Sequence, residues 1–328
     1  MSTKTHTIKR VAVLGCGVIG TSWTALFLAG GYSVDVYDPA PNAQKNIVSD
    51  IKAIWPTLKA LGYDCTFDET KLIFHDNAST AVTNADFIQE SVPERLAIKH
   101  ELFALIEPHL KPDAIVSSSA SGLMLSEMQI GWRSPSRFIL GHPFNPPHLI
   151  PLVELLGNDQ THVDVLSIAE AFYQELGKVT IRVKREVPAH VANRLQAALW
   201  REAISLVVEG VASVDDVDKA VWAGPGLRWA AMGPHQLFHL GAGVGGLEEF
   251  CKRYGDSFHR WWDDLGDVRL PPDVVNELFR GVNEKSTERT NENAKLIAHE
   301  NESSLRDELI VAMLESSNPI RRRMDRQS

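Results

Sequence analysis

The sequence predicts an α/β protein in which an N-terminal doubly wound parallel sheet is followed by an all-α C-terminal domain. Over residues 9–183, short apolar strand patterns alternate with helical patterns, which is typical of a parallel sheet covered by helices. A Gly-x-Gly-x-x-Gly run follows the first strand pattern directly. After Pro188 the periodicity is helical, so we expect one domain over residues 1–187 and a second over residues 188–328.

The composition narrows the class of protein. A formal net charge of −9 over 328 residues disfavours nucleic acid as a partner, because nucleic acid binding needs a basic face. The three cysteines are widely separated and form no CxxC motif, which suggests a reducing compartment. The polar N-terminus is not followed by the apolar core of a signal peptide, and no apolar run approaches bilayer length. We therefore expect a soluble, cytoplasmic protein with no membrane partner.

The first strand–helix–strand unit predicts a dinucleotide site. A strand over 9–14 precedes the glycine run, a helix over 21–29 follows it, and a strand over 32–38 ends on an acid. In such a unit the three glycines allow a tight turn, close approach of the pyrophosphate and close helix–strand packing. The phosphates then bind at the helix N-terminus. The expected cofactor residues here are Gly15, Gly17, Val18, Ile19, Gly20 and Asp38.

Asp38 predicts which dinucleotide binds. A carboxylate at the end of the second strand would accept hydrogen bonds from both ribose hydroxyls and would repel a 2′-phosphate. No Arg or Lys follows it at once, so the sequence favours NAD over NADP. The alternative is a glycine turn that binds no nucleotide.

The remaining elements of the first domain follow in alternation. Asp38 is followed by a long helix, which we expect to be kinked or broken near Pro56. The expected helices are 43–61, 96–110 and 163–176, and the expected strands are 72–74, 85–92, 114–121 and 179–183. Glu94 and Ser121 fall at carboxyl ends of strands, where ligands bind in open parallel sheets. Ser121 has no GxSxG context, so we do not expect a hydrolase nucleophile.

Residues 139–154 place a histidine and a glutamate in a run of apolar residues and prolines. The prolines favour extended chain over helix. A buried His or Glu is costly without a partner, so we expect His142 and Glu154 to pair, with one strand running out and the next returning. A carboxylate on one imidazole nitrogen leaves the other nitrogen as a general base. The alternative is a structural ion pair in the core.

Two further motifs are weaker evidence for a nucleotide or metal site. Residues 241–246 also fit Gly-x-Gly-x-x-Gly, but they lie in helical surroundings without a preceding strand, so we expect a flexible loop. His235 and His239 have the spacing of a zinc-binding helix, but Gln236 replaces the glutamate that such chemistry requires. We expect no metal site.

Taken together, these motifs resemble the 3-hydroxyacyl-CoA dehydrogenase superfamily over nearly the whole chain. The resemblance implies a Rossmann-type NAD-binding domain, a helical domain that completes the active site, and a homodimer. Gly141–Pro146 with Glu154, Ser117–Leu123, Val187–Arg194 and Gln89–Lys99 are similar to four segments of the family. By this resemblance the catalytic residues are His142, Glu154, Ser121 and Asn193, and Glu94 and Lys99 contact the nicotinamide ribose.

The segment Gly224–Pro234 indicates the substrate class. Its inserted Gly-Leu-Arg-Trp is similar to the branch of the family that acts on small free hydroxy acids, with the L-carnitine dehydrogenases nearest and the lambda-crystallin/L-gulonate dehydrogenases next. An arginine here would hold a substrate carboxylate. Aromatic faces would bind a quaternary ammonium, although aromatics at these spacings also pack helices together. The expected substrate contacts are Arg228, Trp229, Asn145 and Phe250, with Tyr254, Trp261 and Trp262 as further cage candidates.

The resemblance therefore implies NAD-dependent oxidation of the secondary hydroxyl of a short 3-hydroxy acid, with L-carnitine giving 3-dehydrocarnitine. The alternatives within the family are L-gulonate and a 3-hydroxyacyl-CoA such as 3-hydroxybutyryl-CoA. A different class of answer is a non-catalytic NAD(H)-binding structural protein.

Overall fold

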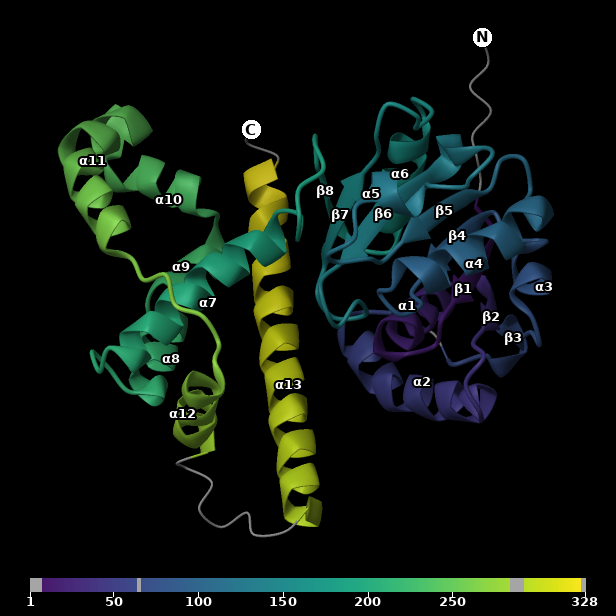
Figure 1. Cartoon of the computed structure of the whole chain (residues 1–328), viewed down its shortest axis with the longest axis horizontal. Helices are drawn as coiled ribbons and strands as arrows, with labels where there is room; N and C mark the ends of the chain where they lie inside the picture. Colours follow the sequence, from purple (N-terminus) through teal and green to yellow (C-terminus); the bar gives the residue numbers. More distant parts are fainter. Residues whose placement is uncertain (1–7, 64–65, 284–291, 326–328) are drawn as a thin grey trace. The chain divides into compact units, whose positions relative to one another are not determined.

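The computed structural model describes residues 8–63, 66–283 and 292–325, the last helix with its side chains over 301–317 (Figure 1). The chain forms two compact units, residues 1–193 together with 304–328, and residues 194–303. The first unit extends a few residues beyond the expected boundary at residue 188. It also takes in the end of the chain, which the helical periodicity alone had assigned to the second domain.

The first unit is built on one eight-stranded sheet with the order β3-β2-β1-β4-β5-β6-β7-β8. Its strands are β1 (Arg10–Leu14), β2 (Ser33–Tyr37), β3 (Leu72–Phe74), β4 (Phe87–Glu90), β5 (Ile115–Ser118), β6 (Phe138–Pro143), β7 (Leu152–Leu156) and β8 (Val179–Arg182). All neighbours pair in parallel except β6 and β7, which are antiparallel. The predicted parallel, doubly wound sheet is confirmed, and its single antiparallel pairing is the one that brings His142 opposite Glu154.

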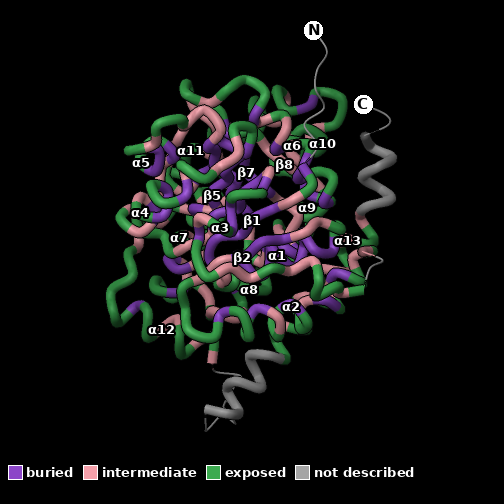
Figure 2. Tube along the Cα trace, turned by 90° about the vertical axis from the view of Figure 1, so that its right-hand side faces the viewer, coloured by how far each residue is buried: buried purple, intermediate pink, exposed green. Residues whose placement is uncertain are grey.

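Helices cover both faces of this sheet because its strands are apolar on both sides. In β1, Val11 and Val13 pack into one core with helices α1 (Val18–Ala29), α2 (Ala43–Ala60) and α6 (Val165–Glu175). Ala12 and Leu14 pack into a second core on the opposite face. That core also contains residues of α3 (Ala78–Val82), α4 (Leu96–Ile106) and α5 (Leu125–Met128). The period-two alternation of a strand thus fills two cores, and the strands at the middle of the unit are buried (Figure 2).

Of the kink or break expected near Pro56, the break is absent. Helix α2 runs without interruption from Ala43 to Ala60 with Pro56 inside it. Its buried residues Ile47, Ile51, Trp55 and Leu58 recur at helical spacing on the face toward the sheet. Burial of each such side chain contributes about 1.5–3 kcal/mol, which offsets the roughly 3 kcal/mol that a proline in a helix interior costs.

The second unit is helical, as the periodicity predicts. It contains most of α7 (Ala192–Val208), then α8 (Val214–Ala223), α9 (Pro225–Ala231), α10 (Pro234–Gly241), α11 (Gly246–Asp264) and α12 (Pro272–Asn283), and the last helix is α13 (Glu292–Asp325). Ser213 caps α8 by accepting a hydrogen bond from the Asp216 amide, as its position before an acidic turn predicts. No described helix is long and apolar enough to span a lipid bilayer.

Candidate active site

The glycine run between β1 and α1 has the geometry of a dinucleotide turn. Gly15 has a φ of +90°, and a Cβ there would lie 2.7 Å from the carbonyl oxygen of Ser91. A Cβ on Gly20 would overlap the carbonyl oxygen of Gly15, so helix and strand approach closely at that point. Gly17 faces open space and is the N-cap of α1, with no side chain capping the helix. The first amides of α1 are therefore available to an anion.

Asp38 lies at the carboxyl end of β2, beside this turn. Its Oδ2 accepts a hydrogen bond of 2.6 Å from the Cys16 amide, and its Oδ1 accepts one of 2.7 Å from the Ala40 amide. A cavity of about 750 Å³ opens here, lined by Gly15, Gly17, Val18, Ile19, Tyr37, Asp38, Pro39, Ala40, Ser91, Val92, Pro93, Ile98, Glu101, Leu102 and Leu105. Apolar walls, an acid at the end of the second strand and exposed helix amides fit the adenosine and pyrophosphate of NAD.

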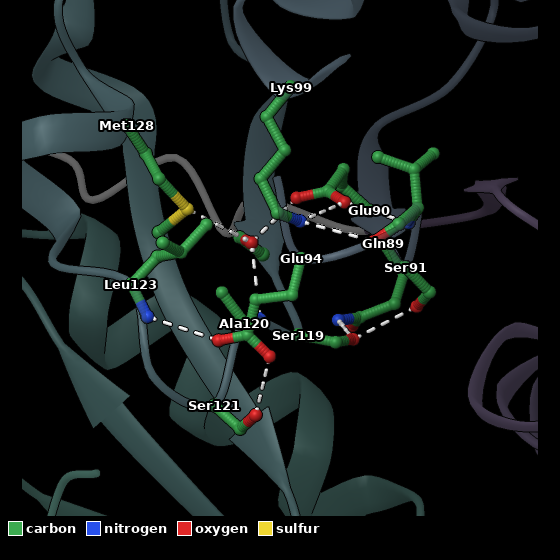
Figure 3. A network of polar contacts seen from close by, with 12 residues as sticks. Gln89, Glu90, Ser91, Glu94, Lys99, Ser119, Ala120, Ser121, Leu123 and Met128 are labelled. Atoms are coloured by element: carbon green, nitrogen blue, oxygen red, sulfur yellow. Dashed lines mark hydrogen bonds and ion pairs between the residues drawn. The ribbon is translucent and has the colours of Figure 1, made fainter. Parts of the chain in front are cut away.

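Glu94 and Ser121 meet between the carboxyl ends of β4 and β5 (Figure 3). The Ser121 hydroxyl donates to Glu94 Oε2 at 2.7 Å, and Glu94 Oε1 accepts the amides of Gly122 and Leu123. Burial alone would raise the pKa of Glu94, but these three hydrogen bonds hold that pKa below its ordinary value. Glu94 is therefore an anion that ties the loop after β4 to the loop after β5.

Lys99 has a partner that the sequence did not reveal. Its Nζ lies 2.5 Å from Glu90 Oε1, and both side chains are fully buried (Figure 3). Glu90 also accepts hydrogen bonds from the Val92 amide and the Ser118 hydroxyl. Lys99 thus fixes the chain that leads to Glu94, and a direct bond from Lys99 to a cofactor stays a prediction.

His142 and Glu154 face each other across the antiparallel pairing of β6 and β7. His142 Nδ1 lies 2.8 Å from Glu154 Oε2, and both side chains are buried. Because a carboxylate accepts, Nδ1 carries the hydrogen, and in the neutral ring Nε2 is a bare acceptor. The arrangement can accept a proton at Nε2 and stabilise the resulting imidazolium through Glu154.

The second oxygen of Glu154 binds the start of α7. Oε1 accepts hydrogen bonds from the amides of Val191 at 2.9 Å and Ala192 at 3.0 Å. Burial raises the pKa of Glu154, but the bonds from His142 and from these two amides outweigh burial and lower it. The negative charge also suits a helix N-terminus. Asn193 follows Ala192 in the first turn of α7, and its role in the site stays a prediction.

His190 is a residue of this site that the sequence reasoning missed. It is 2% exposed, and its ring centroid lies 5.1 Å from that of His142. The segment that contains it drew attention only to Asn193. A polar ring among the apolar residues 187–192 is the signal that would have found it.

The residues expected to contact the substrate belong to both units, and the surroundings of each are given within its own unit. Arg228 and Trp229 lie on α9. Phe250 stacks on Phe238 with ring centroids 4.6 Å apart, so it packs α11 against α10. Trp261 and Trp262 pack against Phe258 and remain more than half exposed. In the first unit, Asn145 is exposed in the loop after β6.

The glycine turn, the acid at the end of β2 and the buried His–Glu pair are features expected of an NAD-dependent oxidoreductase. The chain belongs to the 3-hydroxyacyl-CoA dehydrogenase family. The model of the family's NAD-binding domain matches residues 10–187, and that of its C-terminal domain matches residues 190–271. NAD is therefore the cofactor, and its nicotinamide accepts the hydride when bound.

Several relatives of this chain are called L-carnitine dehydrogenases. An L-carnitine dehydrogenase of Streptomyces coelicolor is 41% identical, with 88% of this chain and 91% of that protein aligned. One of Nocardiopsis dassonvillei is 38% identical over 98% of this chain and 95% of that protein. One of Pseudomonas putida is 39% identical over 94% of each.

Solved structures agree on the fold. A 5-formyl-3-hydroxy-2-methylpyridine 4-carboxylic acid 5-dehydrogenase, an NAD+-dependent dismutase, superposes with a TM-score of 0.76 at 28% identity, over 93% of this chain and 97% of that one. An (S)-3-hydroxybutyryl-CoA dehydrogenase from Ralstonia eutropha has a TM-score of 0.61 at 22% identity, over 78% and 89% of the two chains, and shows the fold alone.

Two glycines of the turn offer a matched test of the cofactor site. We expect Gly20→Ala to lower the melting temperature by several degrees, because overpacking of this kind costs about 1–3 kcal/mol. Gly17→Ala has room in the protein but would occupy space that the pyrophosphate needs. It should leave the melting temperature unchanged and weaken NADH binding about tenfold or more. Thermal unfolding and NADH fluorescence titration measure both. Wild-type NADH affinity in Gly17→Ala would show that the phosphates do not bind at this turn.

Proposed function

We propose that this protein oxidises the 3-hydroxyl of a short free 3-hydroxy acid, namely L-carnitine to 3-dehydrocarnitine, with His142 as the general base. The observation that carries the proposal is the buried hydrogen bond between His142 Nδ1 and Glu154. It leaves Nε2 as the free nitrogen of a ring whose orientation is fixed. The three relatives called L-carnitine dehydrogenases support the choice of substrate.

His142 takes the hydroxyl proton at Nε2 while the carbinol carbon loses a hydride to the cofactor. The imidazolium that forms lies beside the Glu154 carboxylate, which is already ionised because three hydrogen bonds lower its pKa. No proton needs to move to Glu154. Orientation and charge stabilisation of this kind contribute about 10²–10⁴-fold to a proton transfer.

Ser121 and Asn193 position the substrate oxygen in this proposal. The Ser121 hydroxyl donates to Glu94. Because the alcohol has one hydroxyl proton and His142 accepts it in this proposal, Ser121 acts on the substrate oxygen as a donor. To donate to the carbonyl oxygen of the product, this hydroxyl must rotate away from Glu94. Glu94 keeps its bonds to the Gly122 and Leu123 amides during such a rotation, so the loop stays in place.

Arg228 is the proposed anchor for the substrate carboxylate. Its guanidinium presents N–H donors in a planar fork that suits a bidentate ion pair with a carboxylate, which a thioester substrate would not need. Trp229 is the proposed cation–π face for the trimethylammonium group. Phe250 is proposed as a further aromatic contact, although its stacking on Phe238 already gives it a packing role.

The base is tested by His142→Gln. We expect kcat to fall by at least about 10²-fold because no other group takes the proton, with the NADH dissociation constant unchanged. His109→Gln is the matched control, since His109 is exposed and precedes the amino end of β5, whereas His142 lies near the carboxyl end of the parallel neighbour β6. Undiminished turnover by His142→Gln would show that another residue is the base.

The substrate is tested by following NADH formation with L-carnitine, D-carnitine, L-gulonate and 3-hydroxybutyryl-CoA, each with NAD and with NADP. We expect turnover of L-carnitine with NAD. Arg228→Met should then raise KM for L-carnitine about tenfold or more, because a charge-assisted pair is lost, while KM for a CoA ester changes little. Turnover of L-gulonate or of the CoA ester alone would replace carnitine as substrate. NADH binding without any turnover would indicate a non-catalytic protein.

We also propose that the protein is a cytoplasmic homodimer. Support comes from large apolar side chains that the second unit leaves exposed, among them Trp222, Trp261 and Trp262. Multi-angle light scattering should give twice the mass of one chain, and a monomeric mass at micromolar concentration would contradict the dimer. Cell fractionation would test the compartment.

A further inference from the structure

His190 lies at the junction of the three segments that carry the proposed catalytic groups. Its Nε2 lies 3.1 Å from the carbonyl oxygen of Ala120, the residue before Ser121. Its ring lies against that of His142 on β6, with an angle of 50° between the ring planes. The amides of the next two residues, Val191 and Ala192, bind Glu154 on β7. One turn of chain therefore contacts all three segments.

These contacts assign the protonation state of the ring. The Ala120 carbonyl can only accept, so Nε2 of His190 carries a hydrogen. Nδ1 is buried and has no hydrogen-bond partner among the residues that the structure describes. A bare lone pair can remain there at modest cost, whereas a charged N–H donor without an acceptor would be far more costly. The ring is therefore neutral, with its proton on Nε2.

The charges around His190 agree with a neutral ring. Burial lowers its pKa most, and the neighbouring His142 on β6 lowers it further. The Ala120 carbonyl, Glu154 on β7 and Glu94 after β4 act in the opposite direction and do not compensate. The pKa of His190 is consequently below its ordinary value.

The backbone here is held in an unfavourable conformation. Ala189 has a φ of 63° and His190 a φ of 52°, so two consecutive non-glycine residues are left-handed. Such residues cost on the order of 1–3 kcal/mol each and persist only where their surroundings enforce them. These surroundings are the hydrogen bonds that the Val191 and Ala192 amides donate to Glu154, and the hydrogen bond from the His190 ring to the Ala120 carbonyl.

We propose that His190 is a positioning residue of the dehydrogenase reaction, whose neutral Nε2–H holds the Ala120–Ser121 segment in register with the His142–Glu154 pair. This inference rests on the proposed function. The Ser121 hydroxyl bonds to Glu94, on the loop after β4. The bond from His190 to Ala120 is what connects the serine segment to the turn that Glu154 binds. Without this hydrogen bond the Ala120–Ser121 segment would keep its fold, but the distance between Ser121 and His142 would no longer be fixed.

Three variants separate the ring from the backbone conformation. His190→Phe keeps an aromatic ring and loses the donor. His190→Asn tolerates the left-handed conformation but is too short to reach Ala120. Ala189→Gly is the control, because it relieves the neighbouring left-handed residue and leaves the imidazole in place.

We expect both His190 variants to lower kcat about 10–100-fold, since a displacement near 1 Å costs about that much. KM for the substrate, the NADH dissociation constant and the melting temperature should change little by comparison. Ala189→Gly should keep wild-type kcat with an equal or higher melting temperature. The pH profile of kcat/KM should keep its midpoint in His190→Asn, because His190 does not exchange the reaction's proton.

Other results would overturn the assignment. Wild-type kcat in both His190 variants would remove the positioning role. A fall in melting temperature with wild-type kcat at low temperature would make His190 a structural residue only. Loss of the acidic limb of the pH profile would make it a base rather than a positioning residue.

A measurement without substrate distinguishes this inference from the proposed function. Long-range ¹H–¹⁵N spectra of histidine-labelled protein, assigned by comparison with His190→Asn, should show His190 protonated only on Nε2, with a pKa below the ordinary histidine value. Titration at an ordinary histidine pKa, about 6.5, would contradict the buried geometry. Absence of turnover by the wild-type protein with every substrate would refute the proposed function, and with it the positioning role, while these spectra still tested the Ala120 hydrogen bond.

Discussion

The buried carboxylate of Glu154 is the interaction on which the rest of the site depends. One oxygen orients His142 and the other binds the first amides of α7. Removing one member of a buried, hydrogen-bonded charged group costs about 3–5 kcal/mol, because the partners stay buried without it. A loop that must satisfy such an acid has little freedom. The two amide hydrogen bonds that help to keep Glu154 ionised are therefore also among the contacts that enforce the left-handed turn at Ala189 and His190.

The sheet supplies the precision of this arrangement. The antiparallel pairing of β6 and β7 puts His142 opposite Glu154 through main-chain hydrogen bonds. A slip of one residue would turn Glu154 to the other face of the sheet and bring an apolar neighbour opposite the histidine. Residues of β7 fill both cores, Val153 and Leu155 on one face and Leu156 on the other, so such a slip would also expose apolar surface. Packing thus fixes the distance between His142 and Glu154.

Much of this could be predicted from residue patterns. The glycine turn, the acid at the end of β2 and the pairing of His142 with Glu154 each follow from a local rule about turns, helix ends or buried charge. What could not be predicted depends on contacts distant in sequence. No local pattern indicates that Lys99 forms an ion pair with Glu90, or that the His190 ring reaches the carbonyl of Ala120, 70 residues earlier in the chain. Helix α2 continues through Pro56 because tertiary burial outweighs local propensity, which a local rule does not weigh.

Asp38 has a second task besides the one its position suggests. Its two oxygens already hold the amides of Cys16, inside the glycine turn, and Ala40, in the loop after β2. Each oxygen retains a lone pair for a ribose hydroxyl, so recognition and scaffolding use the same carboxylate. Preference for one dinucleotide is consequently coupled to the rigidity of the turn. Redesign toward a phosphorylated cofactor would have to replace two structural hydrogen bonds as well as remove a repulsive charge. A single substitution of Asp38 would therefore also loosen the glycine turn that binds the cofactor.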